Sequence, residues 1–137
     1  MKRTSLLWPA VALIASCSTI FPTPAPGPTQ EPPNVLPDPT DPSQPITGTA
    51  GETFEIVLAS NSSTGFRWRL IGELDESIVQ LTGQDYLGQR PVIPGSGGVD
   101  IWTFSGVSPG DTTLTLGYFP PGGTQPDQTV TFTIHVK

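Results

Sequence analysis

Apolar and polar residues alternate along much of the C-terminal two thirds of the chain. The clearest run ends the chain, where Val130, Phe132, Ile134 and Val136 alternate with Thr129, Thr131, Thr133 and His135. A period of two is typical of a β-strand with one buried face. Similar segments lie at residues 52–58, 66–70, 77–82, 99–106 and 112–118.

Turn-forming residues separate these segments. Ser108-Pro109-Gly110-Asp111 is a strong turn signal, because proline presets φ and glycine tolerates positive φ. No segment has a convincing helical period, although residues 72–76 could form one short turn. About six or seven short strands with regular turns predict an all-β, immunoglobulin-like antiparallel β-sandwich in residues 46–137. Since this region has no cysteine pair, Trp68 and Trp102 are expected to fill the core by packing alone.

The N-terminus has a different character. Lys2 and Arg3 precede a short apolar run at residues 6–14, which is the layout of a secretory signal and too short to span a bilayer stably. Small residues then precede Cys17, the only cysteine, as in a bacterial lipobox. We predict a lipoprotein signal peptide over residues 1–16 and a lipid on Cys17. The alternatives are an ordinary signal peptide with an incidental cysteine, or a free buried thiol.

A proline-rich stretch follows the cysteine, so that residues 17–45 are expected to form a lipidated linker. Ten of the 17 prolines lie in residues 18–45. Because proline fixes φ and lacks an amide donor, the stretch predicts an extended spacer of up to about 3 Å per residue, without helix or strand. Ser18 stands where an aspartate would favour the inner membrane. We therefore expect a lipid-anchored protein of the bacterial envelope, on the outer membrane if the cell is Gram-negative.

Charge and residue types exclude several functions. The chain has 12 acidic and 6 basic residues, which argues against nucleic-acid binding because that needs clustered Lys and Arg. The only histidine, His135, is interpreted as a solvated strand residue with no catalytic constellation around it. The acidic residues lack the spacing of a calcium loop. We expect no enzymatic activity, no cofactor and no metal.

Two loop motifs carry the clearest functional signal. Asn61-Ser62-Ser63-Thr64-Gly65-Phe66 leads into the strand that carries Trp68, and Gly95-Ser96-Gly97-Gly98 leads into the strand that carries Trp102. The pair resembles the chagasin-like inhibitors of papain-type cysteine peptidases, whose loops carry Asn-Pro-Thr-Thr-Gly-Phe/Tyr and Gly-x-Gly-Gly. The resemblance extends over residues 46–137, since the family's later order of residues is also present: Trp102, Phe104, Gly110, Leu114, Leu116 and Tyr118.

The third loop departs from the family pattern. Where the family usually has Tyr-x-Arg-Pro-Trp, this chain has Tyr118-Phe119-Pro120-Pro121-Gly122. It keeps the tyrosine and a proline but lacks the arginine and the tryptophan. Arg and Trp are typical binding anchors, so their loss is expected to lower affinity. Phe119 is a candidate replacement as an apolar anchor.

The resemblance implies a reversible proteinaceous inhibitor that occludes the active-site cleft of a papain-like cysteine peptidase with loops at one end of a monomeric sandwich. It places Thr64 near the peptidase's catalytic cysteine, and Phe66 and Trp68 would anchor the loop base in the core. Gly65, Gly97 and Gly98 would allow close backbone approach and unusual φ. The residues expected to bind the peptidase are Asn61, Ser62, Ser63, Thr64, Gly65, Phe66, Gly95, Ser96, Gly97, Gly98, Phe119, Pro120 and Pro121.

A second interpretation stays open. The same loops could be ordinary sandwich turns, since strand connections need Gly, Ser and Asn in any case. The chain would then be a non-inhibitory immunoglobulin-like envelope module that binds another surface protein or a glycan.

Overall fold

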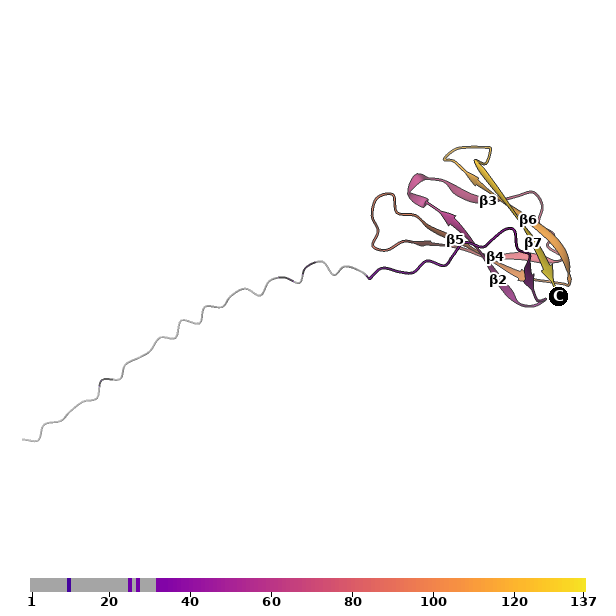
Figure 1. The fold of residues 1–137 in the computed structure, drawn as a ribbon, viewed down its shortest axis with the longest axis horizontal. Helices are drawn as coiled ribbons and strands as arrows, with labels where there is room; N and C mark the ends of the chain where they lie inside the picture. The colour runs from indigo at the N-terminus through magenta and orange to yellow at the C-terminus, as the bar shows by residue number, and fades with distance from the viewer. Residues whose placement is uncertain (1–9, 11–24, 26, 28–31) are drawn as a thin grey trace, which may run out of the picture.

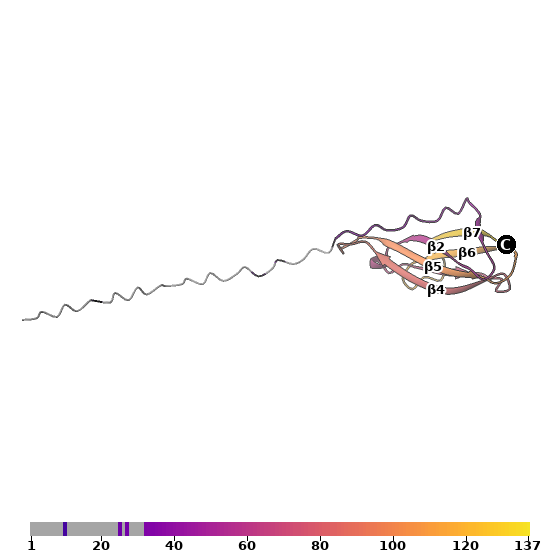
Figure 2. The same cartoon turned by 90° about the horizontal axis from the view of Figure 1, so that it is seen from below.

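The computed structural model of the chain describes residues 10, 25, 27 and 32–137. Cys17 and, apart from Ala10, the predicted signal peptide lie outside the described residues. Two β-sheets pack face to face (Figures 1 and 2). No helix in the described part of the chain is long and apolar enough to cross a membrane.

The strands form one sheet of four and one sheet of three. The four-stranded sheet has the order β1 (Ile46–Gly48), β7 (Gln128–Val136), β6 (Gly110–Phe119) and β3 (Arg67–Ile71). The three-stranded sheet has the order β2 (Thr53–Ser60), β5 (Gly98–Gly106) and β4 (Val79–Gly88). All neighbours are antiparallel except β1 and β7, which are parallel. The predicted antiparallel β-sandwich is confirmed, with β1 as an unpredicted short addition.

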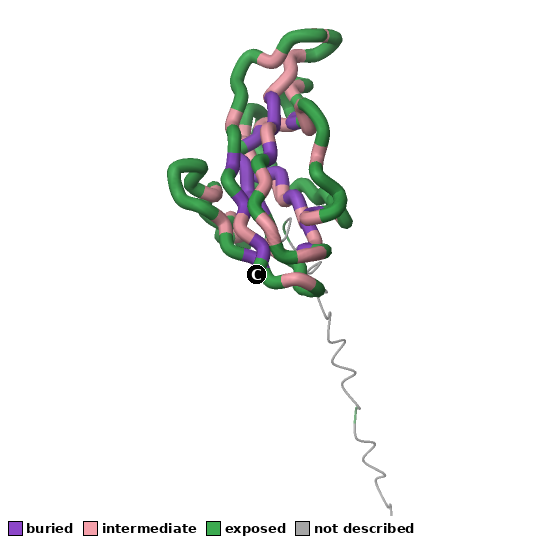
Figure 3. The backbone as a smooth tube through the Cα atoms, turned by 90° about the vertical axis from the view of Figure 1, so that its right-hand side faces the viewer, coloured by how far each residue is buried: buried purple, intermediate pink, exposed green. Residues whose placement is uncertain are grey.

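The core lies between the two sheets and follows the predicted alternation. Phe132 of β7 and Phe104 of β5 are fully buried. Trp68 and Trp102 are 6% and 3% exposed, which confirms that the two tryptophans fill the core. Figure 3 shows buried segments within the strands and exposed segments at the turns.

Strand β4 differs most from its prediction. It runs to Gly88 and not to residue 82, and a β-bulge between Leu81 and Gly83 shifts its register against β5. A bulge inserts one extra residue and breaks the period of two, so the alternation did not reveal the second half of the strand. The turn before β4 also lies later than the turn predicted at residues 72–76. In the structure, the amide nitrogens of Ile78 and Val79 donate to the carbonyl oxygen of Asp75 at 3.0 and 2.9 Å.

The proline-rich segment is packed against the sandwich over residues 34–45, which we call the strap. As predicted, it has no helix or strand. However, the backbone nitrogen of Thr40 donates to the carbonyl oxygen of Val57 at 2.8 Å, and the nitrogen of Val57 donates to Thr40 Oγ1 at 2.9 Å. Figures 1 and 2 show the strap running along the sandwich. Since β2 is an edge strand, the strap occupies part of an edge that would otherwise be open to pairing.

A turn at Asp41 leads the strap into β1. Asp41 Oδ1 accepts hydrogen bonds from Ser43 Oγ at 2.7 Å and from Ser43 N at 2.9 Å. These two bonds stabilise the charged carboxylate and hold the pKa of Asp41 below its ordinary value. The turn is an Asx-type turn, which proline and serine at the next two positions favour.

Candidate functional site

Three loops emerge at the same end of the sandwich. The last residue of β2, Ser60, pairs with the first residue of β5, Gly98. The first residue of β3, Arg67, pairs with the last residue of β6, Phe119. The β2–β3 loop (residues 61–66), the β4–β5 loop (residues 89–97) and the β6–β7 loop (residues 120–127) therefore lie together, and we call this region the loop end.

The β2–β3 loop is held by its own hydrogen bonds. It forms one 3-10 turn, η1 (Ser62–Thr64), in which Asn61 Oδ1 accepts from Ser63 N at 3.2 Å and from Ser63 Oγ at 2.6 Å. Thr64 Oγ1 donates to the carbonyl oxygen of Asn61 at 2.7 Å. The prediction that Asn61 bonds its own loop backbone is confirmed. The turn itself was not predicted, because three residues are too few to show a helical period.

The base of this loop rests on aromatic side chains. Tyr118 stacks on Phe66 with 5.0 Å between ring centroids and lies 4.9 Å from Trp68. Its hydroxyl oxygen accepts from Asn61 N at 3.0 Å, so the tyrosine joins the loop to β6. Trp68 is in the core as expected and donates from Nε1 to the carbonyl oxygen of Ala59 at 3.0 Å. Phe66 is only half-buried and reaches the core through Tyr118.

The β4–β5 loop is longer and is joined to the first loop. Gln89 N donates to the carbonyl oxygen of Gly97 at 3.0 Å, and Ser96 N donates to that of Ile93 at 2.9 Å. Asn61 Nδ2 donates to the carbonyl oxygen of Gly95 at 3.3 Å. The structure thus brings together the two predicted binding motifs.

Two glycines permit close contacts at the loop end. Gly65 has φ of +81°, and an ideal Cβ placed there would lie 2.7 Å from Pro121 Cγ, so the first and third loops touch. An ideal Cβ at Gly98 would collide with the carbonyl oxygen of Leu87 and lie 2.5 Å from the Tyr86 hydroxyl. Neither Gly97 nor Gly98 has a positive φ, so the predicted unusual φ is confirmed for Gly65 alone of the three glycines. At Gly98 glycine is needed for space.

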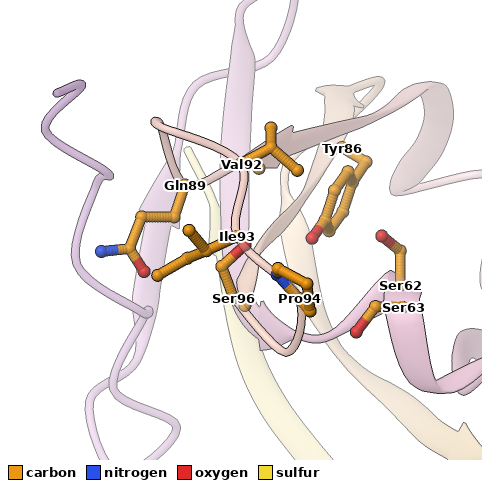
Figure 4. Close-up of a pocket in the computed structure, with 10 residues that line it drawn as sticks. Ser62, Ser63, Tyr86, Gln89, Val92, Ile93, Pro94 and Ser96 are labelled. Carbon is orange, nitrogen blue, oxygen red and sulfur yellow. The ribbon is translucent and has the colours of Figure 1, made fainter. Parts of the chain in front are cut away.

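A cavity of about 430 Å³ lies between the β2–β3 and β4–β5 loops (Figure 4). Ser62 and Ser63 line one side, and the other side is formed by β4 and its loop, including Tyr86, Val92 and Ile93. Val92 is 84% and Ile93 59% exposed. These apolar side chains were not among the predicted binding residues. The available signal was the pair of prolines around them, since Pro91-Val92-Ile93-Pro94 cannot extend a ladder and must present its aliphatic residues in a loop.

The segment predicted as the third binding loop, residues 118–122, is divided between two faces. Pro121 contacts the first loop at Gly65. Phe119 follows the inward-facing Tyr118 and therefore lies on the outer face of the four-stranded sheet, where the guanidinium carbon of Arg69 is 5.1 Å from its ring centroid. The cation–π contact covers this ring. The structure thus separates Phe119 from the cavity between the first two loops.

Other chemistry-bearing residues lie away from the loop end. His135 Nδ1 pairs with Asp111 Oδ1 near the opposite end, where β6 begins and β7 finishes. The imidazole is exposed, as predicted, although its carboxylate partner was not anticipated. Within residues 32–137 and the other described positions, no three His, Cys, Asp or Glu side chains gather into a metal site.

A sandwich with three loops at one end, in which the β2–β3 loop contacts both of the others, has the architecture of a loop-presenting domain. Residues 47–136 match the chagasin family of peptidase inhibitors, family I42. This match covers well over half of the chain, which therefore belongs to the family. The family consists of peptidase inhibitors, so the chain is not an enzyme.

Two solved structures are similar in fold. The crystal structure of the cysteine protease inhibitor EhICP2 from Entamoeba histolytica has a TM-score of 0.55 and 22% identity, over 67% of this chain and 85% of that chain. The solution structure of amebosin has a TM-score of 0.53 and 28% identity, over 67% of this chain and 87% of that chain. No curated protein matches the chain.

Proposed function

We propose that the chain is a reversible inhibitor of papain-like cysteine peptidases and that its loop end occludes their active-site cleft. Family membership supports peptidase inhibition. The observation that supports the mode of action is that the β2–β3 loop contacts both other loops at one end, through the Asn61–Gly95 hydrogen bond and the approach of Gly65 to Pro121.

The geometry suits the blocking of a narrow groove. The tip of the β2–β3 loop is exposed at Ser63, Thr64 and Gly65, and its base is fixed by Tyr118 and Trp68. A loop that is already held in shape loses less conformational entropy when it binds. Blocking of this kind needs no chemical step, so the peptidase should regain activity when the inhibitor dissociates.

The proposed interface combines the residues expected from the family with Val92 and Ile93, which line the cavity. Thr64 would lie nearest the catalytic cysteine, by resemblance to the family. The aliphatic side chains of Val92 and Ile93 extend the same surface and would be removed from water by a peptidase seated on the loop end. Such exposed apolar residues at a polar loop end are typical of binding surfaces.

An alternative remains that the domain binds an envelope protein or glycan without inhibiting a peptidase. The third loop favours this alternative, because it lacks the arginine and tryptophan of the family and Phe119 lies beneath Arg69 on the outer face.

Titration of residues 18–137 against papain tests the proposed function. These residues contain the strap and the whole core. Inhibition should be reversed by dilution, with the inhibitor chain intact by mass spectrometry. Absence of inhibition against several papain-like enzymes at micromolar concentration would favour the alternative.

We further propose that a lipid on Cys17 anchors the protein to a bacterial membrane. The described chain reaches the sandwich at the loop end, where Asn34 contacts Gly88. A tether leaving from there would keep the loop end on the side of the domain that faces its anchor. Cys17→Ser should release the protein from the membrane fraction or block its processing, and unchanged fractionation and maturation would contradict the proposal.

A further inference from the structure

Asn34 of the strap contacts the candidate binding surface. Asn34 Nδ2 donates to the carbonyl oxygen of Gly88 at 2.9 Å, and Arg90 N donates to Asn34 Oδ1 at 2.6 Å. Gly88 is the last residue of β4, and the β4–β5 loop begins at the next position. One side-chain amide therefore pairs with two backbone groups where the strand becomes the loop. It acts there like a short piece of neighbouring strand.

This contact lies where the ladder between β4 and β5 ends. The Gln89–Gly97 hydrogen bond closes the base of the loop, and Arg90 N is the first amide beyond it. The exposed residues Val92 and Ile93 follow after Pro91. A connection of this length exceeds a tight hairpin turn and does not fix its own shape as a two-residue turn does. The Asn34 contact thus restrains the loop at the point where its own pairing stops.

The strap is itself held against β2, so Asn34 has a defined position. Thr40 makes two hydrogen bonds to Val57 in the middle of β2. Between Asn34 and Thr40 the chain contains Pro37 and Pro39, whose fixed φ reduces the number of conformations that a released strap would gain. Leu36 is half-buried against the sandwich. The strap precedes the region that matches the family, residues 47–136.

We propose that the strap positions the β4–β5 loop for binding, with Asn34 as the positioning residue. The proposal rests on the function proposed above, because the loop is taken to contact a peptidase. Asn34 acts through the backbone of Gly88 and Arg90 and need not touch the peptidase. The proline-rich segment then has two roles, as a spacer in its first part and as a support of the binding surface in its second.

Amide hydrogen exchange and inhibition of papain, measured on residues 18–137, test this proposal together. In Asn34→Ala, exchange at the Arg90 amide should accelerate about tenfold, because its acceptor is lost. The inhibition constant should rise about fivefold, since the loop must be ordered on binding. Val35→Ala is the matched control, because Val35 is 94% exposed, and it should change neither quantity.

Two further variants separate positioning from a general loss of structure. Asn34→Asp keeps the acceptor for Arg90 N and loses the donor to Gly88, so it should retain protection of the Arg90 amide. Thr40→Ala removes the acceptor for Val57 N far from the loop, and it should also accelerate exchange at Arg90 and weaken inhibition. Thr40→Ser should restore both.

The outcomes that overturn the proposal are distinct. Unchanged Arg90 exchange in Asn34→Ala would show that the strap does not hold the loop. Faster exchange with unchanged inhibition would show that the held loop is not positioned for binding. If the parent chain inhibits no papain-like peptidase, the proposed function fails, and the exchange rates still decide whether the strap holds the loop.

Discussion

The two loops that line the cavity are stabilised in different ways. The β2–β3 loop is short and holds itself, through the Asn61 side chain and the 3-10 turn it caps. The β4–β5 loop is longer and carries exposed aliphatic residues. It has two hydrogen bonds of its own and is also hydrogen-bonded from outside, by Asn34 and Asn61. The candidate binding surface thus combines a loop held by its own capped turn with a loop that is also supported by the strap. Each should respond to different mutations.

The largest effect should come from removing the aromatic base of the β2–β3 loop. Trp68 is 6% exposed, packs near Tyr118 and donates to the carbonyl oxygen of Ala59. Trp68→Ala should lower the free energy of unfolding by about 3–5 kcal/mol through loss of contacts and a cavity. Urea denaturation measures this change. A loss below about 1 kcal/mol would show that the loop base does not depend on this side chain.

A bulky residue at the tip of the self-supporting loop should impair binding without unfolding the domain. Thr64 is exposed at that tip. Thr64→Trp should weaken inhibition of papain by about 10- to 100-fold, as overpacking of a filled interface costs about 1–3 kcal/mol. Thr64→Ala controls for loss of the hydrogen bond to Asn61 without added bulk. Equal inhibition by Thr64→Trp and the parent chain would place this loop outside the peptidase cleft.

The longer loop should contribute through its aliphatic side chains. Val92→Ser should weaken inhibition about fivefold, because part of the roughly 1.5–3 kcal/mol available from burying a valine is lost. Its thermal stability should change little, since Val92 is 84% exposed in the free domain. Val35→Ser, at a site of 94% exposure in the strap, is the matched control. Identical inhibition by these two variants would exclude Val92 from the interface.

The smallest expected effect, that of Tyr118→Phe, tests whether the two loops are supported independently. Tyr118→Phe keeps the aromatic stack on Phe66 and removes the hydroxyl that accepts from Asn61 N. It should cost about 1 kcal/mol of stability and accelerate amide exchange at Asn61. Exchange at Arg90 should stay unchanged, because that amide depends on Asn34. Equal acceleration at both amides would mean that the two loops are supported as one unit.

Much of the fold was predictable from the alternation of residues, and the exceptions have physical causes. β7 alternates without a break and was predicted to within a residue of its bounds. β1 has only three residues, and the bulge in β4 reverses the alternation partway along the strand. Local pattern could not reveal either element, because each depends on pairing with a distant strand.

The candidate site was predictable in its motifs and less so in its supports. Asn61 forms the turn that its residue type favours. The role of Asn34 could not be derived from sequence, because its two partners are more than fifty residues away. The prolines of the strap correctly excluded helix and strand. They carried no information on whether the segment lies against β2, since the contact uses the Thr40 side chain and one backbone amide.

The most direct test of the proposed mode of action compares two forms of papain. One has a free cleft, and in the other a peptidyl reagent attached to the catalytic cysteine fills the cleft. Binding of residues 18–137 to each form can be followed by calorimetry. Occlusion by the loop end predicts stoichiometric binding to the free enzyme and no binding to the blocked enzyme. Equal binding to both forms would contradict the claim that these loops enter the active-site cleft.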